Sequence, residues 1–163
     1  MIETKRLRIR EFVLEDAEVL SMYRNKEEVC QYQSWSHYPL IKAQKRIEYC
    51  LKYPFNGERG NYQVAVVLKD TDILIGDFFI EVHSPSTVIL GYTFDSSYWT
   101  LGYASESLQA IMAYMKEVYN FKVALCYVLK DNIRSINLLK RNGFEEFEHS
   151  RYMGDIGFRR LLT

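Results

Sequence analysis

A glycine and two small residues stand where an apolar strand pattern gives way to a helical one. Gly102 has no Cβ, and Ala104 and Ser105 follow it at the predicted start of the helix. Small side chains let the unpaired backbone N–H groups of a helix start approach a bound group closely. The helix dipole favours negative charge at the same place, which is typical of a phosphate-binding turn. A single glycine also fits an ordinary tight turn, so a second signal is needed.

The second signal is a polar pair, Asn132 and Ser135, at the start of a shorter predicted helix downstream. Asn is a good helix N-cap, and the Asn-x-x-Ser spacing fits a first helical turn. Lys140, Arg141 and Gly143 fit the end of the same helix. A capping amide can also hydrogen-bond a ligand, so both roles stay open for Asn132.

The elements that position these residues follow from periodicity. Residues 88–94 are rich in β-branched and aromatic side chains, which indicates a buried central strand. From Ala104 onward, apolar residues recur at helical spacing and predict an amphipathic helix. Helices are also predicted over 15–24 and between Pro39 and Pro54. Further strands are predicted over 7–12, 62–68, 73–82 and 123–128, followed by a last hairpin of 144–151 and 158–162.

Other chemistries lack the residues that they need. Three isolated histidines give no zinc-ligand spacing. Neither a Gly-x-Ser-x-Gly elbow nor a Gly-x-x-x-x-Gly-Lys-Ser loop occurs. Cys30, Cys50 and Cys126 are scattered and are expected to be free thiols. The aromatic residues within 32–38 have no basic cluster beside them, so they indicate a site wall or core rather than a nucleic-acid surface.

Length and charge narrow the classes of protein and partner. The 163 residues predict a single domain over 1–163, and 48% of them are hydrophobic, enough for a core. The formal net charge of zero gives no general attraction to nucleic acid or to an anionic membrane. No apolar run approaches the roughly 20 residues of a membrane span, and the first residues lack the apolar core of a signal peptide. With few cysteines as well, a cytoplasmic location is expected.

Three segments together resemble the GNAT acyltransferase superfamily, and within it the RimJ/RimL-like N-acetyltransferases. LRIREF is similar to the first strand of the family. GYTFDSSYWTLGYASESL is similar to its acyl-CoA loop, usually patterned Q/R-x-x-G-x-G/A, and DNIRSINLLKRNGF to its N-x-x-S end piece, which closes on Gly-Phe. The resemblance spans nearly the whole chain. It implies an α/β (α+β) fold with a mixed, mostly antiparallel central sheet of about six to seven strands, flanked by about four helices.

The resemblance also implies an acetyl-CoA-dependent N-acetyltransferase, in which an amine attacks the thioester directly and no metal takes part. Backbone N–H groups of the turn before the long helix would hold the diphosphate of CoA. Backbone groups of the central strand and the Asn-x-x-Ser pair would meet the pantetheine arm. The residues predicted to bind the co-substrate are Tyr92, Phe94, Leu101, Gly102, Tyr103, Ala104, Ser105, Asn132 and Ser135.

Three positions depart from the family's pattern. Trp99 stands where Gln or Arg is common, and Thr100 where a first glycine is common. Because backbone groups supply the contacts, CoA binding remains expected. Leu139 stands where many members have the tyrosine that is thought to protonate the departing thiolate. Water, Tyr98 or Tyr103 could supply that proton instead.

The general base is predicted to be Glu81, near the end of the strand that precedes the central one, with Asp95 and His83 as further candidates. Each of these groups could also be a solvated charge at a strand end. Glu106 matches a family stretch at the start of the long helix. It is expected to be structural there, because acidic side chains are favoured at a helix start.

The acceptor is predicted to be either a protein N-terminal α-amine or a small-molecule amine. An α-amine has a pKa of about 8 and a lysine side chain one of about 10.4, so the α-amine costs less to deprotonate where no strong base is evident. Small molecules with a lowered amine pKa fit equally. Residues 25–38 and the last hairpin are expected to shape the acceptor site. A non-catalytic acyl-CoA-binding module is the alternative function, and the protein could be a monomer or a homodimer.

Overall fold

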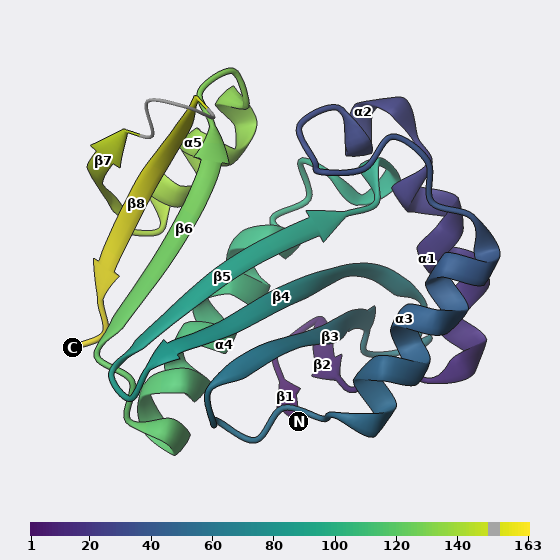
Figure 1. Ribbon diagram of the computed structural model, residues 1–163, viewed down its shortest axis with the longest axis horizontal. Coiled ribbons are helices and arrows are strands. Elements are labelled where there is room, and N and C mark those ends of the chain that lie inside the picture. Colours follow the sequence, from purple (N-terminus) through teal and green to yellow (C-terminus); the bar gives the residue numbers. More distant parts are fainter. Residues whose placement is uncertain (150–153) are drawn as a thin grey trace.

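The computed structural model describes residues 1–149 and 154–163, and its centre is one twisted sheet (Figure 1). The sheet has eight strands in the order β1-β2-β3-β4-β5-β6-β8-β7, and all neighbours are antiparallel except β5 and β6. The strands are β1 (Ile2–Glu3), β2 (Leu7–Arg10), β3 (Gly60–Leu68), β4 (Leu74–Ser84), β5 (Thr87–Phe94), β6 (Val123–Leu129), β7 (Glu145–His149) and β8 (Asp155–Leu161).

The helices lie between these strands in the predicted order. They are α1 (Ala17–Arg24), α2 (Glu27–Cys30), α3 (Leu40–Lys52), α4 (Tyr103–Tyr119) and α5 (Ile133–Arg141), with 3₁₀ turns η1 (Leu14–Asp16) and η2 (Ser96–Tyr98). None of the helices within the described ranges has the length and apolar character that a bilayer span requires.

The predicted mixed, mostly antiparallel fold is confirmed, although the elements are more numerous than expected. The additional elements include β1, of two residues, and α2, of four residues. Elements this short carry too few residues for a periodic pattern. In the predicted hairpin strand 144–151, the residues from 150 onward lie outside the described part of the chain.

Helices cover both faces of the sheet (Figure 1). One core joins the sheet to α4 and α5, and a second core joins it to α1 and α3. β3 contributes to both, because Val64 and Val66 face the first core while Ala65 and Val67 face the second. A strand covered on both faces reads as a continuous apolar run instead of an alternating one.

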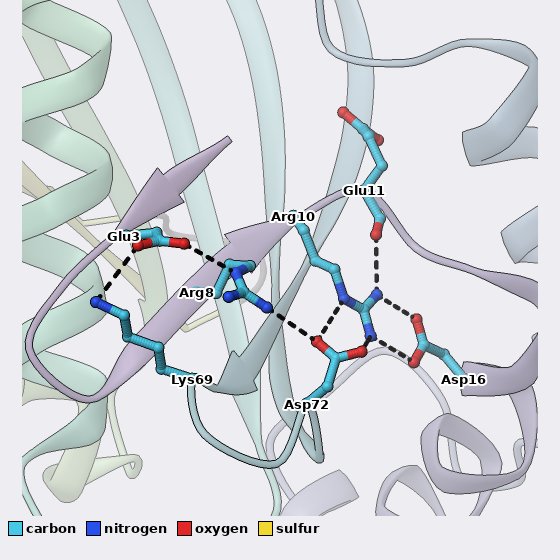
Figure 2. Close-up of polar contacts among 7 residues, drawn as sticks. All are labelled: Glu3, Arg8, Arg10, Glu11, Asp16, Lys69 and Asp72. Carbon is cyan, nitrogen blue, oxygen red and sulfur yellow. Dashed lines mark hydrogen bonds and ion pairs between the residues drawn. The ribbon is translucent and has the colours of Figure 1, made fainter.

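Ion pairs tie the N-terminal edge of the sheet together, as Figure 2 shows. Arg10 reaches Asp16 at 2.8 Å and Asp72 at 3.2 Å, so β2 is linked both to η1 and to the turn between β3 and β4. Arg8 lies between Glu3 at 3.2 Å and Asp72 at 3.6 Å. These contacts fix β2, and Arg6, just before it, hydrogen-bonds Glu106 of α4 and the Leu101 carbonyl.

Candidate active site

Strands β5 and β6 meet at one end and diverge at the other (Figure 1). Their parallel pairing covers only 87–89 opposite 123–125. A cavity of about 440 Å³ opens beyond that point. It is walled by the second halves of both strands, the turn before α4, one side of α5 and the segment that begins at α2.

The turn before α4 holds left-handed backbone at two residues, Thr100 (φ 65°) and Gly102 (φ 83°). Glycine adopts this conformation freely, whereas a β-branched threonine is strained in it. The position of Thr100 therefore suits glycine, the residue common there in the family's pattern. The indole Nε1 of Trp99 donates to the Phe94 carbonyl at 3.0 Å and closes the turn onto the end of β5.

The same turn presents a row of backbone donors to the cavity. Gly102, Tyr103, Ala104 and Ser105 all line it. Their N–H groups donate to no backbone acceptor in the described ranges, and the Glu106 N–H is the first that does, to the Gly102 carbonyl at 3.0 Å. Free donors and the positive end of the helix dipole together fit a phosphate group.

The first turn of α5 forms the facing wall. The Asn132 Oδ1 accepts the Ser135 N–H at 3.3 Å, so the predicted capping role of Asn132 is confirmed. The Tyr92 hydroxyl crosses from β5 to lie 2.6 Å from the Ser135 Oγ. Burial above all raises the pKa of Tyr92 well above its usual value. Tyr92 therefore stays a neutral phenol at and above neutral pH.

All of the predicted co-substrate-binding residues except Leu101 line this one cavity. The side chain of Leu101 is 50% exposed, and its carbonyl accepts a hydrogen bond from Arg6 Nη1 at 2.9 Å. The Phe94 carbonyl is already bonded to Trp99. The residues grouped by the sequence thus lie together around one cavity, except Leu101, which is not among the residues that line it.

The three candidate bases lie in different surroundings. Glu81 is paired across the sheet with Ile89, where β5 stops pairing with β6, and it is not among the residues that line the cavity. His83 has its Nδ1 3.9 Å from the Glu81 Oε1. Asp95 is buried and forms an ion pair with Lys26 at 2.5 Å. The carboxylate of Asp95 thus has a structural role in an ion pair. Glu81 lies near the end of the cleft where β5 and β6 are still paired.

Two arginines of α5, Arg134 and Arg141, line the cavity, although the sequence had suggested no site role for either. Arg134 places its guanidinium carbon 3.2 Å from the ring centroid of Trp99, and both residues line the cavity. Removal from water lowers the pKa of Arg134. Arg141 lines the same cavity two turns further along α5. Their seven-residue spacing, which puts both on one helix face, is the signal that could have revealed them.

The segment that begins at α2 covers the other side of the cavity. Its lining residues are Glu28, Val29, Tyr32, Gln33 and Ser34. Ser96 Oγ donates to Glu28 Oε1 at 2.7 Å, and this hydrogen bond lowers the pKa of Glu28. Asp155, at the start of β8, also lines the cavity. Both regions that were expected to shape an acceptor site thus contribute residues to the wall of the cavity.

A buried polar network anchors this wall to the sheet. Asp77 accepts hydrogen bonds from the hydroxyl of Tyr23, from Arg24 at 2.6 Å and from Gln63 at 2.7 Å. Arg24 also stacks on Trp35 at 4.2 Å, and its carbonyl accepts the Trp35 Nε1–H at 2.9 Å. A buried carboxylate needs such partners, because an unpaired charge is costly away from water. The network joins α1, β3 and β4 to the segment that follows α2.

Comparison with known proteins identifies the class. The family model described as acetyltransferase (GNAT) domain matches residues 6–145. The chain therefore belongs to the GNAT acetyltransferase family, and it is an N-acetyltransferase of that family. Members of the family use acetyl-CoA.

Individual relatives place the chain within that family. It is 31% identical over 145 residues to the uncharacterized N-acetyltransferase YnaD of Bacillus subtilis (strain 168), covering 87% of this chain and 81% of that protein. Solved structures share the fold at lower identity. RimL, a ribosomal L7/L12 α-N-protein acetyltransferase in complex with coenzyme A, has a TM-score of 0.82 at 19% identity, covering 97% of this chain and 95% of that one. Spermidine N-acetyltransferase from Vibrio cholerae, in complex with CoA and spermine, has a TM-score of 0.81 at 14% identity, covering 98% of this chain and 97% of that one.

Proposed function

We propose that this protein transfers the acetyl group of acetyl-CoA directly to a primary amine, with a protein N-terminal α-amine as the first candidate acceptor. The observation that carries the proposal is the cavity between β5 and β6, which opens onto the row of free N–H groups at the start of α4. Free backbone donors in the turn and apolar side chains such as Leu90 and Val128 along the strands suit a long thioester with a charged tail.

The residues of the turn and of α5 would hold the co-substrate. The N–H groups of 102–105 would bind the diphosphate, and Arg134 and Arg141 would add positive charge from the facing wall. Along a strand, successive backbone groups alternate in direction. The Asp95 N–H bonds to the Ile75 carbonyl of β4, whereas the Phe94 carbonyl bonds to Trp99 and so points away from β4. Tyr92 lies two residues before Phe94, so its backbone groups would point the same way, towards the cleft. Its N–H would be available to polarise the thioester carbonyl.

The state of the Cys126 thiol in the cavity favours direct attack by the amine over a covalent enzyme intermediate. Cys126 lines the cavity but is buried, and burial raises its pKa well above the usual value. A thiol held in its neutral form is a poor nucleophile. The role left to the protein is to align amine and thioester, which can lower a barrier by about 7–11 kcal/mol.

Glu81 remains the proposed base. Burial above all, and then the carboxylates of Glu148 and Glu81, raise the pKa of Tyr127, a cavity-lining residue. Glu81 lies on β4 opposite Ile89, at the end of the cleft where β5 and β6 stop pairing. Glu28 lies on the wall itself, but its lowered pKa makes it a weak base. An acceptor whose amine loses its proton easily suits such a site, which favours an α-amine over a lysine side chain.

RimL acts on a protein α-amine and the Vibrio cholerae relative on spermidine, so both acceptor classes need testing. The experiment is an acceptor screen that follows release of the CoA thiol with N-terminal peptides, polyamines and amino sugars. We expect turnover with N-terminal peptides and a loss of at least tenfold in kcat/KM for Glu81→Gln. Turnover with polyamines alone would move the assignment to small amines. Binding of acetyl-CoA without turnover on any amine would contradict the proposal.

A further inference from the structure

We infer that Arg6 is a positioning residue for the phosphate-binding turn, which it aims from the outer side without touching the ligand. The inference rests on the proposed binding of CoA at the turn before α4. Arg6 precedes β2 and lies nearly a hundred residues from the turn in sequence. It is not among the residues that line the cavity.

The guanidinium of Arg6 holds three groups of the turn region at once. Its Nη1 donates to the Leu101 carbonyl at 2.9 Å, and its Nε donates to Glu106 Oε2 at 2.7 Å. The guanidinium carbon lies 4.3 Å from the ring centroid of Tyr103. A planar fork of donors can make these contacts together, which a lysine cannot.

Planarity of the peptide bond carries the effect across to the cavity. In a trans peptide the C=O and the following N–H point in opposite directions. The Leu101 carbonyl is held towards Arg6, on the outer side of the turn, so the Gly102 N–H must point away from Arg6. Gly102 lines the cavity, and its N–H has no backbone acceptor in the part of the chain that the structure describes. Arg6 thereby fixes the direction of a donor that it does not contact.

Glu106 fixes Arg6 in turn. Its Oε1 accepts the Arg6 N–H at 2.9 Å and the Thr4 hydroxyl at 2.6 Å, in addition to the guanidinium contact. Burial raises the pKa of Glu106, but the hydrogen bonds from Thr4 and Arg6 outweigh it and lower that pKa overall. The carboxylate is therefore ionised at neutral pH and keeps its hold on Arg6.

The test compares Arg6→Gln with Arg8→Gln, using calorimetry with CoA and with pantetheine, which carries no phosphate. Arg8 is a matched control, because it lies on the same edge, is similarly exposed and bonds Glu3 and Asp72 instead of the turn (Figure 2). We expect Arg6→Gln to raise the Kd for CoA about tenfold, equivalent to ~1.4 kcal/mol. The Kd for pantetheine should stay unchanged, and Arg8→Gln should behave like the parent. Exposed ion pairs add little to stability, so both variants should stay folded.

Glu106→Gln separates positioning from direct contact. If Arg6 acts through the turn, loosening it should raise the Kd for CoA, and the double variant should bind no worse than Arg6→Gln alone. If Arg6 touched a phosphate itself, removal of the neighbouring negative charge should strengthen CoA binding, and that result would overturn the inference. Equal losses for CoA and pantetheine, or none for CoA, would also overturn it. Failure of the parent protein to bind CoA would refute the proposed function together with this inference.

Discussion

Gly102 and Thr100 share a left-handed backbone conformation, which is strained for threonine but not for glycine, because only threonine carries a Cβ. Both residues line the cavity, and the N–H groups of 102–105 have no backbone acceptor in the described ranges. Contacts through backbone groups do not depend on side-chain type. The departure at Thr100 from the family's pattern is therefore compatible with binding of a phosphate.

We expect Gly102→Val to weaken CoA binding about tenfold or more and to lower Tm. The new side chain would sit on left-handed backbone, at a cost of about 1–3 kcal/mol, with its Cβ 3.3 Å from Arg6 Nη2. Gly143→Val is the matched control, because Gly143 has a φ of 81° and does not line the cavity. It should lose similar stability, measured by thermal unfolding, and keep the Kd for CoA. Parent-like CoA affinity in folded Gly102→Val would show that the turn is not the phosphate site.

Leu139 is fully buried in the core and carries no proton to donate. We expect that no protein acid with a pKa below about 9 is essential. The pH profile of kcat/KM for the acceptor should then rise and level off, without the descending limb that an essential acid produces. The raised pKa of Tyr92 is compatible with this shape, because a phenol that stays protonated imposes no fall near neutral pH.

The profile should be measured for the parent and for Tyr92→Phe, Tyr98→Phe and Tyr103→Phe, each shown to be folded at every pH. A clear fall between about pH 7.5 and 9 would contradict the expectation. The variant that abolishes such a fall would then identify the acid.

At the scale of elements, the site exists because β5 and β6 separate after a short parallel pairing. β6 instead continues its pairing with β8 along its whole length, up to Leu129 opposite Asp155. The unpaired edge of β5 and the first turn of α5 are left facing each other, linked by Tyr92 and Ser135. The segment that begins at α2 is attached to the end of β5 by the ion pair of Lys26 and Asp95.

We expect Lys26→Met to raise the KM for the acceptor several-fold while leaving the Kd for CoA unchanged. Removing the ammonium leaves the buried carboxylate of Asp95 without its cation, which loosens the wall formed by the α2 segment. Lys45→Met serves as the control, because Lys45 is an exposed residue of α3 and does not line the cavity. Steady-state kinetics with the acceptor found in the screen measure the effect. An unchanged acceptor KM, or a loss confined to CoA, would contradict this role for the segment.

At the scale of the whole molecule, several tyrosine side chains are buried or partly buried. Burial above all raises the pKa of Tyr23, of Tyr38 and of Tyr92 above the usual value near 10. When the pH passes about 10, tyrosines of the unfolded chain begin to lose protons that the folded chain still holds. The unfolded state then binds fewer protons than the folded state, so the free energy of unfolding decreases as pH rises.

We therefore expect the urea midpoint to change little from these groups between about pH 7 and 9 and to fall above about pH 10. Tyr92→Phe should show a smaller fall, because it removes one of the groups with a raised pKa. The measurement is urea unfolding followed by fluorescence at a series of pH values. A midpoint that held constant to pH 11 or so would contradict the expectation.

Local patterns were enough for the parts of the site that are built from neighbouring residues. The capping of α5 by Asn132, the central strand and the helix after Gly102 each depend on a few consecutive positions, and periodicity and capping preferences read such positions directly. The co-substrate residues were predicted from the resemblance to the GNAT family, and all of them except Leu101 line one cavity. That the whole chain forms one domain stays a prediction.

Tertiary structure alone decided which distant residues complete the site. Arg6 meets Leu101, Lys26 meets Asp95, and Arg134 lies over Trp99, each pair separated by tens of residues. An isolated basic residue has no periodicity, and its partner depends on how the sheet brings remote segments together. The sequence also predicted the strand that carries Glu81, but it did not show that Glu81 lies outside the lining of the cavity. That position depends on where β5 and β6 stop pairing.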